Sequence, residues 1–110
     1  MGVAYKLKKF FFITLRVKKY QLLSSCKKVV GKPRLFHPLL LNGGGSINFG
    51  SNVQIGVINS PNYYSHYSYI EARGAGSEII IGNNVSVNNN FSAVAFRKIT
   101  IGNNVIIGVN

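Results

Sequence analysis

Cysteine and acidic residues are scarce in this chain, whose 110 residues include one cysteine and two carboxylate side chains. A lone cysteine, Cys26, cannot form a disulfide within the chain, which excludes a disulfide-stabilised scaffold. Neither a CxxC motif nor a cluster of histidines occurs, so we expect no metal. An apolar content of 46%, against 14% charged residues, excludes a chain that is disordered throughout.

Long apolar runs are also missing. The longest unbroken run, Phe10–Ile13, is far below the roughly 20 residues that span a bilayer. It is also shorter than the roughly 7–15-residue centre of a signal peptide, and no small-residue cleavage site follows it. We therefore expect neither export nor a transmembrane segment, and predict a cytoplasmic protein, either free or peripheral at the inner face of the membrane.

Positive charge is abundant, and it gathers at one end of the chain. The net charge is +11, yet residues 37–110 hold three basic residues against two glutamates, a net charge of +1. Residues 1–36 hold no acid and ten basic residues: Lys6, Lys8, Lys9, Arg16, Lys18, Lys19, Lys27, Lys28, Lys32 and Arg34. This asymmetry predicts a basic amphipathic arm over residues 1–36 and a near-neutral body over residues 37–110.

The arm has helical spacing of apolar residues. Leu7, Phe11 and Leu15 fall on one stripe, which Val3 and Leu22 continue. Two uses remain open, and both can hold together: peripheral contact with an anionic membrane surface, and a cover for the open end of a repeat structure. We expect no nucleic-acid binding, because the chain has no helix-turn-helix or RNA-binding motif.

The body shows a six-residue repeat. Two apolar residues separated by one recur, and a turn rich in Gly and Asn follows each pair. The pairs are Ile47 and Phe49, Val53 and Ile55, Ile79 and Ile81, Val85 and Val87, Phe91 and Ala93, Ile99 and Ile101, and Val105 and Ile107. Such pairs are typical of short strands with one buried face, and strands this short must stack on further turns of a solenoid. The longer step between residues 49 and 81 indicates an insertion over Val57–Tyr69.

The segments Ile81–Ser86 and Ile101–Ile106 resemble the hexapeptide repeat of left-handed β-helix acyltransferases. The last third of the chain is similar to the stretch before the active site of maltose and galactoside O-acetyltransferases. The resemblance implies a left-handed parallel β-helix, and with the helical arm read from the spacing above we expect an all-β solenoid preceded by an amino-terminal basic helical arm. It also implies acetyl-CoA as co-substrate, a sugar or glycan acceptor, no metal, and a homotrimer with sites between subunits.

Candidate substrate-binding residues follow from the same resemblance. Asn88 and Asn90 match an Asn-x-Asn whose first member hydrogen-bonds the acceptor sugar, although all three asparagines at 88–90 also suit a turn. The stretch Tyr69–Arg73 is similar to a segment of surface-polysaccharide acetyltransferases. Its Glu71 and Arg73 differ by two, so they share a face of a strand and either bind acceptor hydroxyls or form a structural ion pair.

No catalytic residue is assigned within the chain. His37 precedes Pro38 ahead of the repeat and fits a boundary role, and His66 fits a surface position in the insertion. The family's catalytic histidine follows the repeat that ends this sequence, so we expect it beyond residue 110. The chain is then an O-acetyltransferase segment of a longer enzyme, inactive alone and acting in cell-surface polysaccharide synthesis. The alternative is a non-catalytic or truncated β-solenoid with a binding or structural role.

Overall fold

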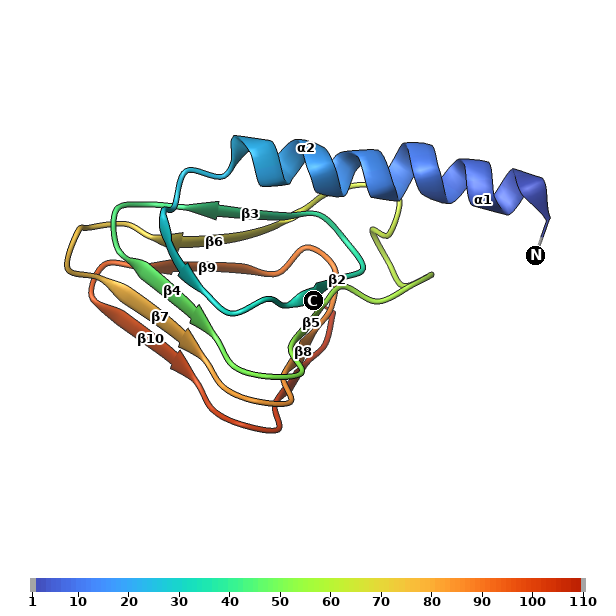
Figure 1. Cartoon of the computed structure of the whole chain (residues 1–110). Coiled ribbons are helices and arrows are strands. Elements are labelled where there is room, and N and C mark those ends of the chain that lie inside the picture. Colours follow the sequence, from blue (N-terminus) through green and yellow to red (C-terminus); the bar gives the residue numbers. More distant parts are fainter. Residues whose placement is uncertain (1, 110) are drawn as a thin grey trace.

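A computed structural model describes residues 2–109 and shows a parallel β-solenoid preceded by a helix (Figure 1). The eleven strands form three parallel sheets. Sheet A contains β1 (Lys28–Val30), β4 (Ser46–Phe49), β7 (Glu78–Ile81) and β10 (Lys98–Ile101). Sheet B contains β2 (Arg34–Leu35), β5 (Gln54–Ile55), β8 (Ser86–Val87) and β11 (Ile106–Ile107). Sheet C contains β3 (Leu39–Asn42), β6 (Ser68–Ala72) and β9 (Ser92–Ala95).

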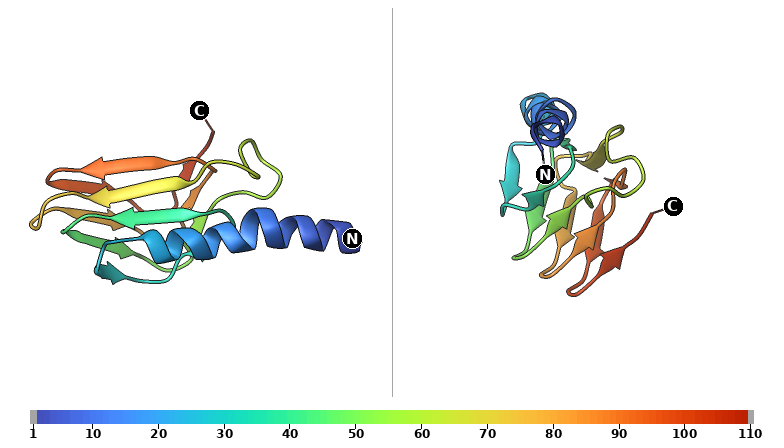
Figure 2. Two further views of the ribbon diagram at one scale, coloured as in Figure 1. Left: turned by 90° about the horizontal axis from the view of Figure 1, so that it is seen from above. Right: turned by 90° about the vertical axis from the view of Figure 1, so that its right-hand side faces the viewer.

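The chain visits the sheets in the order A, B, C, and each visit is one side of a triangular coil. Figures 1 and 2 show that the coils wind with a left hand, as the sequence predicted. Lys28 stacks on Ser46, a step of 18 residues, and Glu78 stacks on Lys98, a step of 20. Ser46 stacks on Glu78 after 32 residues, because the second coil carries most of the predicted insertion between β5 and β6.

The predicted apolar pairs line one interior. Ile47, Ile55, Ile79, Val87 and their partners are buried in a single cluster. Ile101 and Ile107, from the last coil, are partly buried against the same cluster. Burial of each such side chain contributes about 1.5–3 kcal/mol, so the stacking of coils supplies the stability that single short strands lack.

Glycine and asparagine form the corner between sheets A and B. Asn52, Asn84 and Asn104 stand at equivalent places in successive coils, with φ of 56°, 57° and 58°. Asparagine tolerates this left-handed backbone better than most residues, and glycine precedes each corner. A Cβ at Gly82 would lie 2.4 Å from Oδ1 of Asn103, so the next coil leaves no room there for a larger residue.

The amino-terminal helix is continuous and lies beside β3, next to the first coil (Figures 1 and 2). It comprises α1 (Val3–Lys9), a π-helical turn η1 (Phe10–Thr14) and α2 (Leu15–Leu23). Ser24 ends it: its hydroxyl donates to the carbonyl of Tyr20 and accepts from the amide of Leu41. Between residues 2 and 109, no helix is both long enough and apolar enough to cross a membrane.

The face of the helix that packs is not the predicted stripe. Ile13 is buried, whereas Leu7, Phe11 and Leu15 are 52%, 57% and 43% exposed. The π-helical turn adds a residue to the helical repeat in this region, which changes the phase between the segments on either side of it. The helix does lie against the first coil, but the apolar stripe points elsewhere.

The coils also begin earlier than the predicted boundary at residue 37. Strands β1 and β2 lie within residues 28–35, in the segment that the sequence placed in the arm, and they pair with β4 and β5. Each contributes one partly buried side chain to the core, Val29 or Leu35. The basic residues around these two positions hide the apolar pattern from a reading of the sequence.

Candidate functional site

Two adjoining hollows lie where the chain passes from sheet B to sheet C. The first, which we call the asparagine hollow, has a volume of about 210 Å³ and is lined by Asn62, residues 88–92 and residues 107–109. The second, the tyrosine hollow, has a volume of about 340 Å³ and is lined by His66, Tyr67, Tyr69, Asn90 and Ser92. Because Asn90 and Ser92 border both hollows, the two are parts of one polar surface.

Asn88 and Asn90, the two predicted acceptor residues, meet at the asparagine hollow. The turn between β8 and β9 carries both. The side-chain oxygen of Asn88 accepts a hydrogen bond of 2.7 Å from the backbone amide of Asn89, so Asn88 also stabilises its own turn. Asn90 is exposed and has a left-handed backbone, with φ of 63°. The structure therefore brings these two residues together, with Asn90 the more accessible.

Asn89, which the sequence assigned only to a turn, holds the insertion in place. Its side chain is buried; Oδ1 accepts from the amide of Val57 at 2.9 Å. Nδ2 donates to the carbonyls of Val57 and Pro61, both at 3.1 Å. Asn89 thus fixes the insertion that supplies Asn62 to the first hollow and His66 and Tyr67 to the second.

Glu71, on β6, and Arg73, just after its end, point to the same outer side, as their spacing predicted. Arg73 donates from Nε to Oε2 of Glu71 at 2.8 Å and from Nη2 to Oε1 at 3.0 Å. These hydrogen bonds, followed by one from Tyr69, lower the pKa of Glu71 to about 2. The Arg73 guanidinium also lies over the ring of Phe96, with 5.1 Å from its carbon to the ring centroid. The carboxylate is ionised at neutral pH and already has two hydrogen-bonding partners.

Tyr69 connects this ion pair to the hollows. Its hydroxyl donates to Oε1 of Glu71 at 2.7 Å, which raises the pKa of Tyr69, and its side chain lines the tyrosine hollow. Glu71 and Arg73 are not among the residues that line either hollow. The four predicted site residues therefore form two groups, Asn88 with Asn90 at the asparagine hollow and Glu71 with Arg73 beside it. Tyr69 lies between them, because it lines the tyrosine hollow with Asn90 and donates to Glu71. No pattern in the sequence indicates this linking role of Tyr69.

The two histidines have different surroundings. His37 is fully buried, and its Nε2 lies 2.8 Å from the carbonyl of Asn62 and 2.9 Å from that of Ser65. Two acceptors at Nε2 require a proton there, so His37 acts as a donor that ties the insertion to the first coil. Burial lowers the pKa of His37, and the hydrogen bonds to the two carbonyls oppose this shift.

His66 lies on the surface, at the edge of the tyrosine hollow. Its Nδ1 is 2.7 Å from the hydroxyl oxygen of Ser65. The surface position agrees with the one expected from the sequence, whereas the contact with Ser65 was not expected. His66 has a left-handed backbone, with φ of 61°, and lines the tyrosine hollow together with Asn90.

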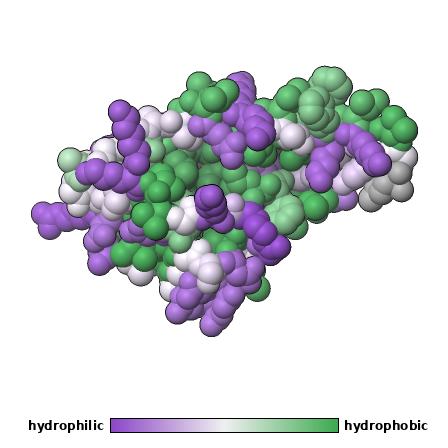
Figure 3. All heavy atoms as spheres, in the orientation of Figure 1, coloured by the Kyte–Doolittle hydropathy of each residue, from purple (hydrophilic) through white to green (hydrophobic). Residues whose placement is uncertain are grey.

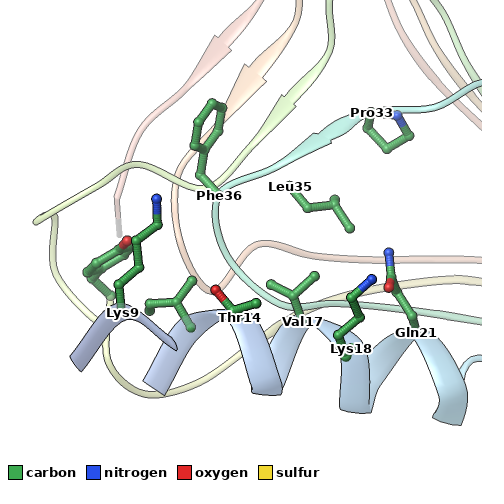
Figure 4. Close-up of a pocket in the computed structure, with 10 residues that line it drawn as sticks. Lys9, Thr14, Val17, Lys18, Gln21, Pro33, Leu35 and Phe36 are labelled. Carbon is green, nitrogen blue, oxygen red and sulfur yellow. The ribbon is translucent and has the colours of Figure 1, made fainter. Parts of the chain in front are cut away.

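A hollow larger than these two lies elsewhere, between the helix and the first coil (Figure 4). It has a volume of about 460 Å³. The helix contributes Lys9, Thr14, Lys18 and Gln21, which Figure 4 shows facing Pro33, Leu35 and Phe36 of the coil. None of the site residues predicted from the sequence lines it, so its size alone does not make it the functional site.

Three parallel sheets surround an aliphatic core, and the strands within each sheet stack in register. This arrangement defines the chain as a parallel β-solenoid with an amino-terminal helix. Comparisons of the chain with protein families, with curated proteins and with solved structures found no match.

Proposed function

We propose that this chain is a segment of an O-acetyltransferase, which transfers an acetyl group from acetyl-CoA to a sugar hydroxyl in cell-surface polysaccharide synthesis. The observation that carries the proposal is the meeting of Asn88 and Asn90 at one hollow of a left-handed β-helix, next to Tyr69. An amide group both donates to and accepts from hydroxyls, and a tyrosine ring presents an apolar face with a polar tip. Together these groups suit a neutral, hydroxyl-rich acceptor.

The chemistry assigned to the site has two requirements. A base must take the proton from the acceptor hydroxyl as its oxygen attacks the thioester carbonyl, and hydrogen-bond donors must stabilise the oxyanion that forms. His37 does not suit the base, because its Nε2 is engaged by two carbonyls. The resemblance assigns the base to a histidine beyond residue 110. Within the chain, His66 is the histidine that borders the hollows.

An acetyl-transfer assay with a panel of glycans tests the proposal on the longest natural form of the protein. We expect transfer to a hydroxyl acceptor, with release of free CoA. Asn90→Gly removes the amide but keeps the left-handed backbone, so it should lower kcat/KM for the acceptor by roughly tenfold, the effect of one lost hydrogen bond. Asn59→Gly is the matched control, because Asn59 is also exposed with a left-handed backbone, of φ 59°, but lines neither hollow.

Three results are informative. An equal loss in both variants would assign Asn90 to the fold of the turn. Retained activity after replacement of the downstream histidine, with loss in His66→Gln, would move the base into this chain. No transfer to any acceptor would contradict the proposal. The resemblance further leads us to propose a homotrimer with sites between subunits, which analytical ultracentrifugation tests directly.

A non-catalytic solenoid is the second candidate, and the pairing of the acidic side chains favours it. Glu71 is bonded to Arg73, and Glu78 lies 3.6 Å from Lys98. Both carboxylates in residues 2–109 therefore have a cationic partner, which suits a structural role better than proton transfer. Glycan binding at the hollows without acetyl transfer, lost in Asn90→Gly, would support this candidate over the enzyme.

A further inference from the structure

The amino-terminal helix exposes more large apolar side chains than any other part of the described chain. Eight of its residues are more than two-fifths exposed: Val3, Leu7, Phe10, Phe11, Phe12, Leu15, Leu22 and Leu23. Figure 3 shows apolar atoms along the helix with hydrophilic side chains among them. Other residues of the helix face the body of the protein, and of these Ile13 is buried. So many exposed large apolar side chains on one element mark a candidate interaction surface.

The charge around these residues restricts the partner. The helix carries six cations and no acid: Lys6, Lys8, Lys9, Arg16, Lys18 and Lys19. A second copy of the same helix would bring like charges together, which opposes self-association. A nucleic acid would match the charge but would leave the leucine and phenylalanine side chains exposed. An anionic lipid surface matches both features, because its headgroups attract the cations and its acyl boundary accepts the apolar side chains.

The position of the helix allows such contact without disturbing the coils. α1 extends past the ends of the strands, as both Figure 1 and the left view of Figure 2 show. The helix is anchored to the body by Ile13, by the stacked rings of Tyr20 and Tyr67 at 4.4 Å, and by the hydrogen bonds of Ser24. The exposed apolar side chains of the helix are therefore held in a fixed orientation relative to the solenoid.

We propose that the amino-terminal helix binds the surface of an anionic membrane, lying in the interface with Leu7, Phe11 and Leu15 buried in lipid. This inference does not depend on the proposed enzymatic activity. It places the solenoid at a membrane surface, whatever the two hollows bind.

Co-sedimentation of the whole chain with vesicles tests the inference. We expect binding to phosphatidylcholine vesicles that contain phosphatidylglycerol, little binding to phosphatidylcholine alone, and weakening at about 1 M salt, where the Debye length falls to about 3 Å. The double variant Leu7→Gln and Phe11→Gln keeps the charge and removes two lipid-facing side chains. It should weaken binding by about tenfold or more. The double variant Lys6→Gln and Lys19→Gln should lower binding to the anionic vesicles only.

The control is Ile106→Gln, which removes an apolar side chain that is 85% exposed on the coil surface, away from the helix. It should leave vesicle binding unchanged, and circular dichroism should show that every variant keeps its fold. Equal binding to neutral and anionic vesicles, or no binding to either, would overturn the inference. So would an unaltered affinity in Leu7→Gln, Phe11→Gln. Loss of a dimer in that variant without any vesicle binding would assign the surface to a second copy instead.

Discussion

The side-chain amide of Asn84 donates a hydrogen bond of 3.1 Å to Oδ1 of Asn104, its equivalent one coil further along the solenoid. Asn52 donates to Asn84 in the same way at 2.9 Å. The three residues form a ladder along one corner, and each also has the left-handed backbone that the corner needs. Side-chain bonds and backbone conformation thus favour the same stacking of coils, which is why asparagine suits this position better than glycine.

We predict that Asn84→Ala destabilises the protein by about 3–4 kcal/mol. The change removes the two ladder bonds, each worth about 1 kcal/mol, and places an alanine in a left-handed conformation that costs about 1–2 kcal/mol. Asn84→Gly should cost less, because glycine accepts the conformation and only the bonds are lost. Urea unfolding at neutral pH measures both. An alanine variant as stable as the natural protein would show that the ladder does not stabilise the corner.

The interior of the column should respond strongly to truncation at its centre. Ile79 is fully buried on β7, which has β4 on one side and β10 on the other. Ile79→Ala should therefore lower the free energy of unfolding by about 2–5 kcal/mol. Ile106→Ala, on the exposed side of β11, should change it by less than about 0.5 kcal/mol. Similar losses in both variants would contradict the assignment of inward and outward faces.

The repeat was predictable because its signals are local. Inward aliphatic residues two apart and Gly-Asn corners recur within six residues, and β4, β5, β7, β8, β10 and β11 all lie where that pattern placed strands. The first coil was not recognised because neither Val29 nor Leu35 has a second aliphatic residue two positions away, and basic residues lie close to both. The packing face of the helix was also missed, since it depends on the π-helical turn and on contacts with the coil, neither of which the apolar spacing reveals.

The candidate site was predictable only in part, for a similar reason. The pairing of Glu71 with Arg73 follows from their spacing on a strand, which brings i and i+2 to one face. The role of Asn89 depends on Val57, which is 32 residues earlier in the chain. The convergence of Asn90 with His66 and Tyr69 depends on how the insertion folds back over the solenoid. Contacts of this kind have no signature in a short stretch of sequence.

Acid should weaken the fold through Glu71. The pKa of its carboxyl is lowered from 4.5 to about 2 by the hydrogen bonds from Arg73 and Tyr69. The unfolded chain therefore takes up a proton more readily, and the stabilisation is complete above pH 4.5 and lost as the pH falls towards 2. Glu71→Gln should remove this part of the pH dependence while it leaves the curve above pH 5 parallel to that of the natural protein. Urea unfolding between pH 2 and 6 measures it, and an unchanged acid limb would contradict the prediction.

A second loss of stability should begin at higher pH and arise from His37. Burial lowers its pKa below 6.5, aided by the nearby charge of Arg16, and the hydrogen bonds from Nε2 to Asn62 and Ser65 oppose the shift. The unfolded state then binds more protons than the folded state just below pH 6.5. Stability is therefore complete above that pH and falls as the pH drops through 6.5 towards the folded-state value.

His37→Gln separates this effect from a simple loss of contacts. Glutamine carries an amide that donates to the two carbonyls but does not titrate near neutral pH, so stability should become nearly constant between pH 7 and 5. His37→Ala should cost about 1–3 kcal/mol at pH 7, because buried carbonyls lose their donor. His66→Gln, on the surface, is the control and should keep the pH dependence of the natural protein. If His66→Gln flattened the profile and His37→Gln did not, the buried histidine would not be the group that couples protonation to folding.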